Sequence, residues 1–325
     1  MSQTLNIAFL GLGDHATRGH LEPLLKLMGE DTIFGVFDPH KTKALRAGKY
    51  GKNLRFFRSE KTLLKWADAV LICTPDHLHL GQMEAAIAAG CHVMCEKPLV
   101  SNASDMPRLR KVLKKAERDN LVITSCHPRR CDLPYKGVKD DLPFLQERYG
   151  KLLEVRLDFS YHAPSKVGLH GGSLLQDHAN HEIDYLCYLL GEVPKYVEAY
   201  KLFDSFDRYH MCGRVSGEVA FTFTGTRRLP ESTYPETIFL RFERGEMFVD
   251  TYSEENSYHL EHATRKRYDM AGVGVTDYPL RFHQLNHELL NAFQGGNNYL
   301  SAEQLLLNTE MSVAFHTSDR FTYNC

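Results

Sequence analysis

The sequence predicts an α/β protein with two domains: an N-terminal domain on a doubly wound parallel sheet, and a C-terminal α/β domain with an open, largely antiparallel sheet. Three observations predict this fold class. Short apolar runs alternate with amphipathic segments over the first 125 residues, a glycine-rich turn follows the first run, and segments of period two come later. A length of 325 residues suits two domains, which we place at 1–125 and 126–325.

The N-terminal domain is expected to consist of β-α-β units. Strands that are buried on both faces are short and continuously apolar. Such runs occur at residues 6–10, 32–37, 69–73, 92–95 and 122–124. Helical segments separate them at residues 15–28, 61–66, 78–89 and 104–118. Regular alternation of strand and helix favours parallel pairing with right-handed crossovers.

The C-terminal domain is expected to combine helices with an antiparallel or mixed sheet. A helix over 138–149, a strand over 152–161 and a helix over 173–190 come first. Period-two segments follow at 196–201, 217–226, 237–242 and 245–252. Late helices are predicted at 281–293 and 302–318, and the last is a candidate to pack back on the first domain.

Composition and charge narrow the class of protein. Contents of 43% hydrophobic and 25% charged residues are typical of a globular protein with a sizeable core. A formal net charge of −2 offers no broad attraction for nucleic acid or an anionic membrane. The first residues lack the basic segment of a secretion signal, and no stretch approaches the roughly 20 apolar residues of a membrane span. We therefore expect a cytoplasmic enzyme or binding protein with neither nucleic acid nor membrane as a partner.

The cysteines and histidines show no spacing that predicts a disulfide framework or a metal site. The eight cysteines contain no C-x-x-C pair, which favours reduced thiols. The 17 histidines include no H-E-x-x-H or comparable zinc spacing. No metal site is expected.

A glycine-rich motif, Gly11-Leu12-Gly13-Asp14-His15-Ala16, lies between the first predicted strand and helix. It satisfies G-x-G-x-x-G/A in the strand–turn–helix context that a dinucleotide requires. The glycines permit a tight turn and let the backbone approach a pyrophosphate at the helix N-terminus. The motif predicts a dinucleotide site.

Asp38 supplies the acidic residue that such a site requires. It ends the second predicted strand, 22 residues after Ala16, near the spacing at which a carboxylate binds the ribose hydroxyls. A carboxylate there would repel a 2′-phosphate, so NAD is favoured over NADP. Lys41 lies close by and keeps NADP as an alternative.

Two more predicted strands end in polar loops, where ligands collect in open α/β sheets. The first loop holds Thr74, Pro75 and His79, and the second is Glu96-Lys97-Pro98. Proline fixes its own φ and restricts the residue before it, so Lys97 is held in place. An ordinary surface turn is the alternative interpretation of the triplet.

A helix predicted in the second domain carries a further group of candidates. Asp177, His181 and Asp184 fall at i, i+4 and i+7 and so share one helix face. A carboxylate and an imidazole placed in this way can bind a polyol and exchange a proton near neutral pH. A plain helix-surface contact is the alternative.

The glycine fingerprint, Thr-Pro-x-x-x-His, Glu-Lys-Pro and a glycine-led Asp-x-x-x-His-x-x-Asp helix occur in this order. With these motifs the chain resembles the Gfo/Idh/MocA family, the relatives of glucose–fructose oxidoreductase and inositol dehydrogenase. The resemblance implies a Rossmann domain and a C-terminal domain whose open sheet forms a homodimer or homotetramer. It also implies NAD(P)-dependent hydride transfer to or from a hydroxyl or carbonyl carbon of a sugar, cyclitol or sugar derivative.

The resemblance implies roles for individual residues. Lys97 looks like the lysine that hydrogen-bonds the reacting oxygen, Asp177 like the substrate-binding carboxylate, and His181 like the residue that transfers the proton. The Lys97–Pro98 peptide bond is expected to be cis. The cofactor side is expected to comprise Gly11, Gly13, Asp14, His15, Ala16, Asp38, Thr74, Pro75, His79, Glu96 and Lys97.

Some positions depart from the family pattern or stay open. Ala179 stands where many relatives have glycine, with the polar residues His178 and Asn180 beside it. Arg130 either contacts an anionic substrate group or lies solvated on the surface. The substrate pocket is expected to include Tyr161, His162, His170 and Asn180. These residue types select no single sugar.

Two other functions stay open for this fold. One is an NAD-dependent, redox-assisted glycosidase, and the other is a non-catalytic NAD(P)-binding regulator. The regulator is expected to have lost the lysine or the histidine, and both are present here.

Overall fold

The computed structural model describes residues 5–40, 48–160, 174–191, 193–205, 207–227, 236–270, 273–315 and 317–324. The chain divides into two compact units. Unit 1 contains Met1–Pro128 and Tyr278–Thr309, and unit 2 contains Arg129–Asp277 and Glu310–Cys325. The chain therefore passes from unit 1 to unit 2 after Pro128, returns to unit 1 for Tyr278–Thr309, and ends in unit 2.

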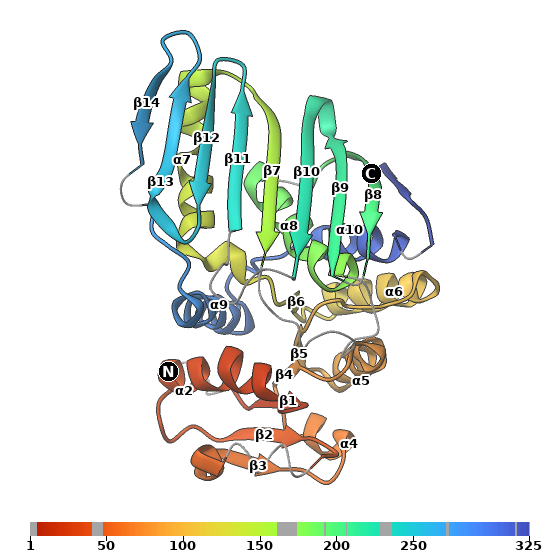
Figure 1. Ribbon diagram of the computed structural model, residues 1–325. Coiled ribbons are helices and arrows are strands. Elements are labelled where there is room, and N and C mark those ends of the chain that lie inside the picture. The colour runs from red at the N-terminus through yellow and green to blue at the C-terminus, as the bar shows by residue number, and fades with distance from the viewer. Residues whose placement is uncertain are drawn as a thin grey trace. The chain divides into compact units, whose positions relative to one another are not determined.

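Unit 1 is built on a six-stranded parallel sheet with the strand order β3-β2-β1-β4-β5-β6 (Figure 1). Its strands are β1 (Ile7–Leu10), β2 (Phe34–Phe37), β3 (Leu54–Phe56), β4 (Ala69–Ile72), β5 (His92–Cys95) and β6 (Ile123–Ser125). Every residue of β1 and β4 is buried, which is why both are continuously apolar. Dinucleotide-binding sheets have this strand order. The order in which the chain adds strands to the sheet changes direction between β1 and β4.

Helices connect these strands. They are α1 (Asp14–Ala16), the π-helix η1 (Thr17–Leu21), α2 (Glu22–Met28), α4 (Glu60–Leu64), α5 (His79–Ala89) and α6 (Met106–Arg118). Unit 1 also contains α9 (Tyr278–Phe293) and the start of α10 (Ala302–Ala314), which follow the strands of unit 2 in the sequence. Short 3₁₀ turns lie at Gly48–Asn53, Asp76–Leu78, Ala103–Asp105, Pro128–Cys131 and Ser216–Glu218. The predicted helix over 15–28 is thus interrupted by one π-helical turn, a rare feature that is frequent at functional sites.

Unit 2 is built on a nine-stranded mixed sheet with the order β14-β13-β12-β11-β7-β10-β9-β8-β15. Within the described residues of this sheet, β7 and β10 pair in parallel and the other neighbouring strands pair antiparallel. The strands are β7 (Leu152–Ser160), β8 (Tyr196–Asp204), β9 (Arg208–Val215), β10 (Val219–Thr226), β11 (Glu236–Phe242), β12 (Gly245–Asp250), β13 (Ser253–Glu261), β14 (Lys266–Asp269) and β15 (Arg320–Asn324). The predicted fold class is confirmed in both sheets.

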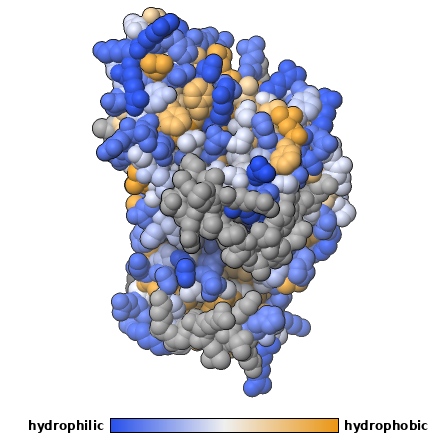
Figure 2. All heavy atoms as spheres, viewed as in Figure 1, coloured by the Kyte–Doolittle hydropathy of each residue, from blue (hydrophilic) through white to orange (hydrophobic). Residues whose placement is uncertain are grey.

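Helices cover one face of the unit 2 sheet, and in the described part of the chain no helix covers the opposite face, which we call the open face. Helices α7 (Leu133–Tyr149) and α8 (Leu174–Leu190) pack on the covered face. Along β11, Ile238 and Leu240 are buried while Phe239 and Arg241 are partly exposed. The open face mixes hydrophobic with hydrophilic residues, as the orange and blue groups in the upper part of Figure 2 show.

Several predicted boundaries were wrong. The helix predicted from residue 138 begins at Leu133, because Pro134 lies in its first turn, where no backbone hydrogen bond is lost. Strand β9 was missed because its alternation is interrupted by polar residues and Gly213. Strands β13, β14 and β15 were missed because they are polar and largely exposed. None of the helices in the described part of the chain combines the length and apolar character needed to cross a membrane.

Candidate active site

The glycine loop follows β1 and leads into α1, as its motif predicts. Gly11 has φ +81°, a conformation that favours glycine, and its N–H donates to the carbonyl of Phe37 at 2.9 Å. A Cβ at this position would lie 2.9 Å from the carbonyl oxygen of Cys73. Only glycine therefore fits this turn between the ends of β1 and β4.

Asp38 lies beside this loop and holds it. Its Oδ2 accepts the backbone N–H of Leu12 at 2.9 Å, and its Oδ1 accepts that of His40 at 2.8 Å. An ionised carboxylate has about four lone-pair sites, so acceptor capacity remains for a ligand hydroxyl. The glycine loop and Asp38 together fit the pyrophosphate and ribose of a dinucleotide.

His79 connects the two polar loops that follow β4 and β5. Its side chain is buried, and its ring nitrogens lie 2.8 Å from the carbonyl oxygens of Thr74 and Pro98. The Thr74 hydroxyl donates to Oε1 of Gln82 at 2.5 Å. The Lys97–Pro98 peptide bond is cis, as the resemblance implies. Lys97 is partly exposed next to this junction.

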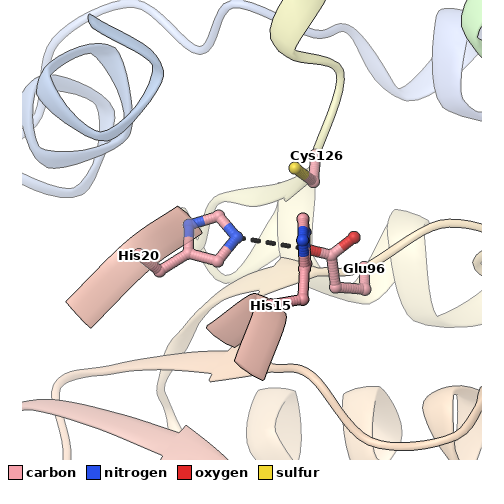
Figure 3. A group of neighbouring side chains, drawn as sticks. All are labelled: His15, His20, Glu96 and Cys126. Atoms are coloured by element: carbon pink, nitrogen blue, oxygen red, sulfur yellow. Dashed lines mark hydrogen bonds and ion pairs between the residues drawn. The ribbon is translucent and has the colours of Figure 1, made fainter. Parts of the chain in front are cut away.

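Glu96 is buried and contacts two histidines. Its Oε1 lies 3.0 Å from Nε2 of His15 and 3.0 Å from Nε2 of His20 (Figure 3). Burial alone would raise the pKa of Glu96, but the charges and hydrogen bonds of His15 and His20 outweigh it and hold this pKa well below its usual range. Glu96 is therefore an ionised group at the end of β5.

His20 was missed by the sequence reasoning. It lies five residues after His15, and in a regular α-helix that spacing turns two side chains about 140° apart. The π-helical turn over Thr17–Leu21 is wider, with hydrogen bonds from i to i+5. This turn lets both rings reach the same carboxylate.

Helix α8 carries the candidates of unit 2. Asp177 is partly exposed and lies 3.9 Å from Nη2 of Arg227, and His181 is partly exposed. The ring of His178 lies between helix and sheet, stacked on Phe159 with the ring centroids 3.3 Å apart. The rings of His178 and His181 meet edge to face at 5.2 Å. The polar groups predicted around Asp177 and His181 therefore lie on the same helix.

Asn180 is buried on the same helix. In the described part of the chain, neither atom of its amide has a hydrogen-bond partner. Buried polar groups are normally satisfied, so such an amide calls for an explanation. A hydroxyl-rich ligand would supply the missing partners.

Arg130 and Asp184 form a buried, bidentate ion pair. Nε and Nη2 of Arg130 donate to the two carboxylate oxygens of Asp184, both at 2.8 Å. Of the two alternatives for Arg130, the solvated surface arginine was wrong, because the side chain is buried and its guanidinium pairs with Asp184. Although Asp184 shares the predicted spacing with Asp177 and His181, it serves this pair.

A second buried network lies under α8 and was not predicted. Arg129 donates to Glu182 at 2.8 Å and also bonds Glu236. Burial alone would raise the pKa of Glu182, but the charge of Arg129, followed by His178, lowers it from 4.5 to about 2. The network ties α8 to the loop before α7 and to β11.

Some predicted residues lie outside the described residues: Lys41, Tyr161, His162, His170 and the glycine-led segment 171–173.

Comparison with known proteins agrees with the parallel sheet of unit 1. Residues 5–124 match the sequence model of GFO_IDH_MocA, described as an oxidoreductase family with an NAD-binding Rossmann fold. The match places residues 5–124 with the Rossmann domains of this oxidoreductase family, the one that the motifs of the chain resemble. The chain is similar to inositol 2-dehydrogenase of Streptomyces avermitilis, with 30% identity over 59% of this chain and 55% of that protein.

Two further relatives extend the comparison. The chain is 27% identical to 4-carboxy-2-hydroxymuconate-6-semialdehyde dehydrogenase of a Sphingobium species, over 58% of this chain and 60% of that protein. The chain thus matches little more than half of the length of these curated relatives. The structure of scyllo-inositol dehydrogenase from Lactobacillus casei matches with a TM-score of 0.74 and 19% identity, covering 96% of this chain and 95% of that one. That likeness shows a shared fold.

Proposed function

We propose that this protein is an NAD(P)-dependent oxidoreductase that transfers hydride between nicotinamide and a CH–OH carbon of a sugar, cyclitol or related polyol. The observation that carries the proposal is the turn at Gly11, which only glycine fits, held by Asp38 in a sheet of dinucleotide-binding order. Because Asp38 would repel a 2′-phosphate, we propose NAD as the preferred cofactor.

The side chains of the protein position the substrate and transfer its proton. The nicotinamide, when bound, accepts or donates the hydride. We assign to Lys97 the hydrogen bond that stabilises the developing alkoxide, and to His181 removal of the hydroxyl proton. Asp177 binds a substrate hydroxyl, and the amide of Asn180 is a further hydrogen-bonding group for a polyol. General acid–base help of this kind is worth about 10²–10⁴-fold in rate.

The relatives' names suggest which substrates to test first. Both inositol 2-dehydrogenase and scyllo-inositol dehydrogenase are named for cyclitols, so cyclitols head the panel, followed by sugars and sugar derivatives. Turnover is measured by nicotinamide absorbance with NAD and NADP in parallel. Net NADH formation with a free polyol supports a dehydrogenase; glycoside cleavage without net NADH formation supports the redox-assisted glycosidase.

Variants test the assigned roles. His181→Ala and Lys97→Ala should each lower kcat by about 10²-fold or more. In His181→Ala NAD should still bind, because this variant changes no residue of the expected cofactor side. His287→Ala and Lys114→Ala are matched controls, since both side chains are exposed on helices of unit 1. Unchanged turnover in His181→Ala would overturn its role. Tight NAD binding without turnover on the whole panel would favour the non-catalytic regulator.

A further inference from the structure

Four potential metal ligands meet in unit 1. They are His15, His20, Glu96 and Cys126, and their donor atoms all lie within 4.8 Å of one another. Figure 3 shows the side chains reaching toward one another from three separate segments. Three of them are buried, while about half of the His15 side chain is exposed and leaves a route from solvent.

The fold brings these segments together. Strands β5 and β6 are parallel neighbours with Cys95 opposite Ser125, so Glu96 and Cys126 emerge side by side at the same sheet edge. The π-helical turn places both histidines against them. The ligands come from residues 15–20, 96 and 126, so no short zinc motif appears in the sequence.

Asn286 orients the ring of His20. The amide nitrogen of Asn286 donates to the carbonyls of Gly19 and Phe282, both at 2.7 Å. Its Oδ1 must therefore face Nδ1 of His20, 3.0 Å away, and that ring nitrogen must be the donor. Metal-bound histidines almost always donate their second N–H in this way, which directs Nε2 to the ion.

Phe282 restrains both rings. It packs edge to face against His15 with centroids 5.5 Å apart and against His20 at 5.9 Å. The two imidazoles are thus held by an aromatic wall from α9 as well as by their hydrogen bonds. This is the kind of supporting shell that keeps ligands in place.

We propose that His15, His20, Glu96 and Cys126 form a binding site for a divalent transition-metal ion of the zinc class. Two imidazoles, one carboxylate and one thiolate make a four-ligand set that suits zinc, and not the oxygen-only sets of Mg²⁺ or Ca²⁺. With bonds of about 2.0–2.3 Å, donors around tetrahedral zinc lie roughly 3.3–3.7 Å apart. The cluster needs only small side-chain shifts to reach this geometry.

A bound metal ion would displace protons from its ligands. Glu96 now accepts an N–H from each histidine, and the ion takes the place of those protons. His20 releases its Nε2 proton, His15 moves its own to Nδ1, and Cys126 releases its thiol proton. The carboxylate and the thiolate then balance the two positive charges. Because the ion joins the glycine-loop helix to the residue before Lys97, it would brace both segments.

Cobalt(II) is the probe that tests the site. Untagged protein is stripped with a chelator, titrated with Co²⁺ and then with Zn²⁺, and followed by absorption and metal analysis. We expect one ion per chain, intense visible bands of tetrahedral cobalt, a sulfur-to-cobalt charge-transfer band, and displacement of cobalt by Zn²⁺. No turnover is measured, so failure of this site and failure of the proposed function are distinguishable.

Variants locate the ion. Cys126→Ser should remove the charge-transfer band, and His15→Ala, a change at a half-exposed side chain, should weaken binding by at least the 10–100-fold typical of supporting-shell changes. Cys212→Ser and His287→Ala are the controls and should bind as the parent does. Circular dichroism checks folding of each variant. The site is refuted if the parent binds no more cobalt than the His15→Ala/Cys126→Ser double variant, or if Cys126→Ser keeps the charge-transfer band.

Discussion

Replacing Asp184 by asparagine would leave the guanidinium of Arg130 buried without its counter-charge. The side chains of Arg130 and Asp184 are only 6% and 1% exposed, and two hydrogen bonds of 2.8 Å join them. Removing one partner of such a pair costs about 3–5 kcal/mol, because the remaining charge loses its compensation.

The expected change in melting temperature follows from this cost. For a unit of this size, each kcal/mol lowers Tm by about 2–4 °C, so Asp184→Asn should lower the unit 2 transition by about 6–20 °C. Differential scanning calorimetry measures it, and denaturant unfolding gives the free energy separately. Asp269→Asn is the control, because the Arg267–Asp269 pair is exposed and worth at most about 1 kcal/mol.

A double variant separates charge compensation from packing. Arg130→Met/Asp184→Leu removes both charges and keeps most of the volume, so it should recover most of the lost stability. If Asp184→Asn melted within about 2 °C of the parent, or if the double variant were as unstable as the single one, the reasoning would be refuted.

Four other perturbations follow from the structure. Gly11→Ala should lower the free energy of unfolding by at least about 1–2 kcal/mol, through its positive φ and the contact with the Cys73 carbonyl. It should also weaken NAD binding in a fluorescence titration, and parent-like affinity would contradict a role of this turn in cofactor binding. Asp38→Ser should lower NAD affinity by about tenfold or more and shift preference toward NADP, measured by titration with both cofactors; an unchanged ratio would count against its role. The pKa of Glu182 is lowered from 4.5 to about 2 in the folded protein. Its ionisation therefore adds about 3 kcal/mol to the free energy of unfolding above pH 4.5, and this contribution is lost as the pH falls toward 2. In Glu182→Gln the free energy of unfolding should depend less on pH over this range. We propose that the open face of the unit 2 sheet forms the interface between subunits. Phe239→Asp places a charge on this face, so it should reduce the molar mass of the oligomer measured by light scattering. An unchanged molar mass would place the interface elsewhere.

The sequence by itself determined the features that depend on neighbours along the chain. The fully buried strands β1 and β4 appear as continuous apolar runs because both faces of the sheet are covered. The turn at Gly11 and the acid at Asp38 follow a spacing set by one β-α-β unit. Helix α8 was predictable from its periodicity, and with it the shared helix of Asp177 and His181.

Tertiary structure alone decided which side chains meet across long separations. Arg130 and Asp184 lie 54 residues apart, and no local pattern links them. His20 reaches Glu96 only because a π-helical turn changes the angle between helix positions, while periodicity analysis assumes a regular helix. Polar strands such as β13 and β14 take their structure from backbone pairing with a neighbour rather than from their own apolar pattern. Local sequence thus encodes backbone geometry and the buried faces, whereas pairing between distant polar groups is settled only when the packed fold places them within hydrogen-bond distance.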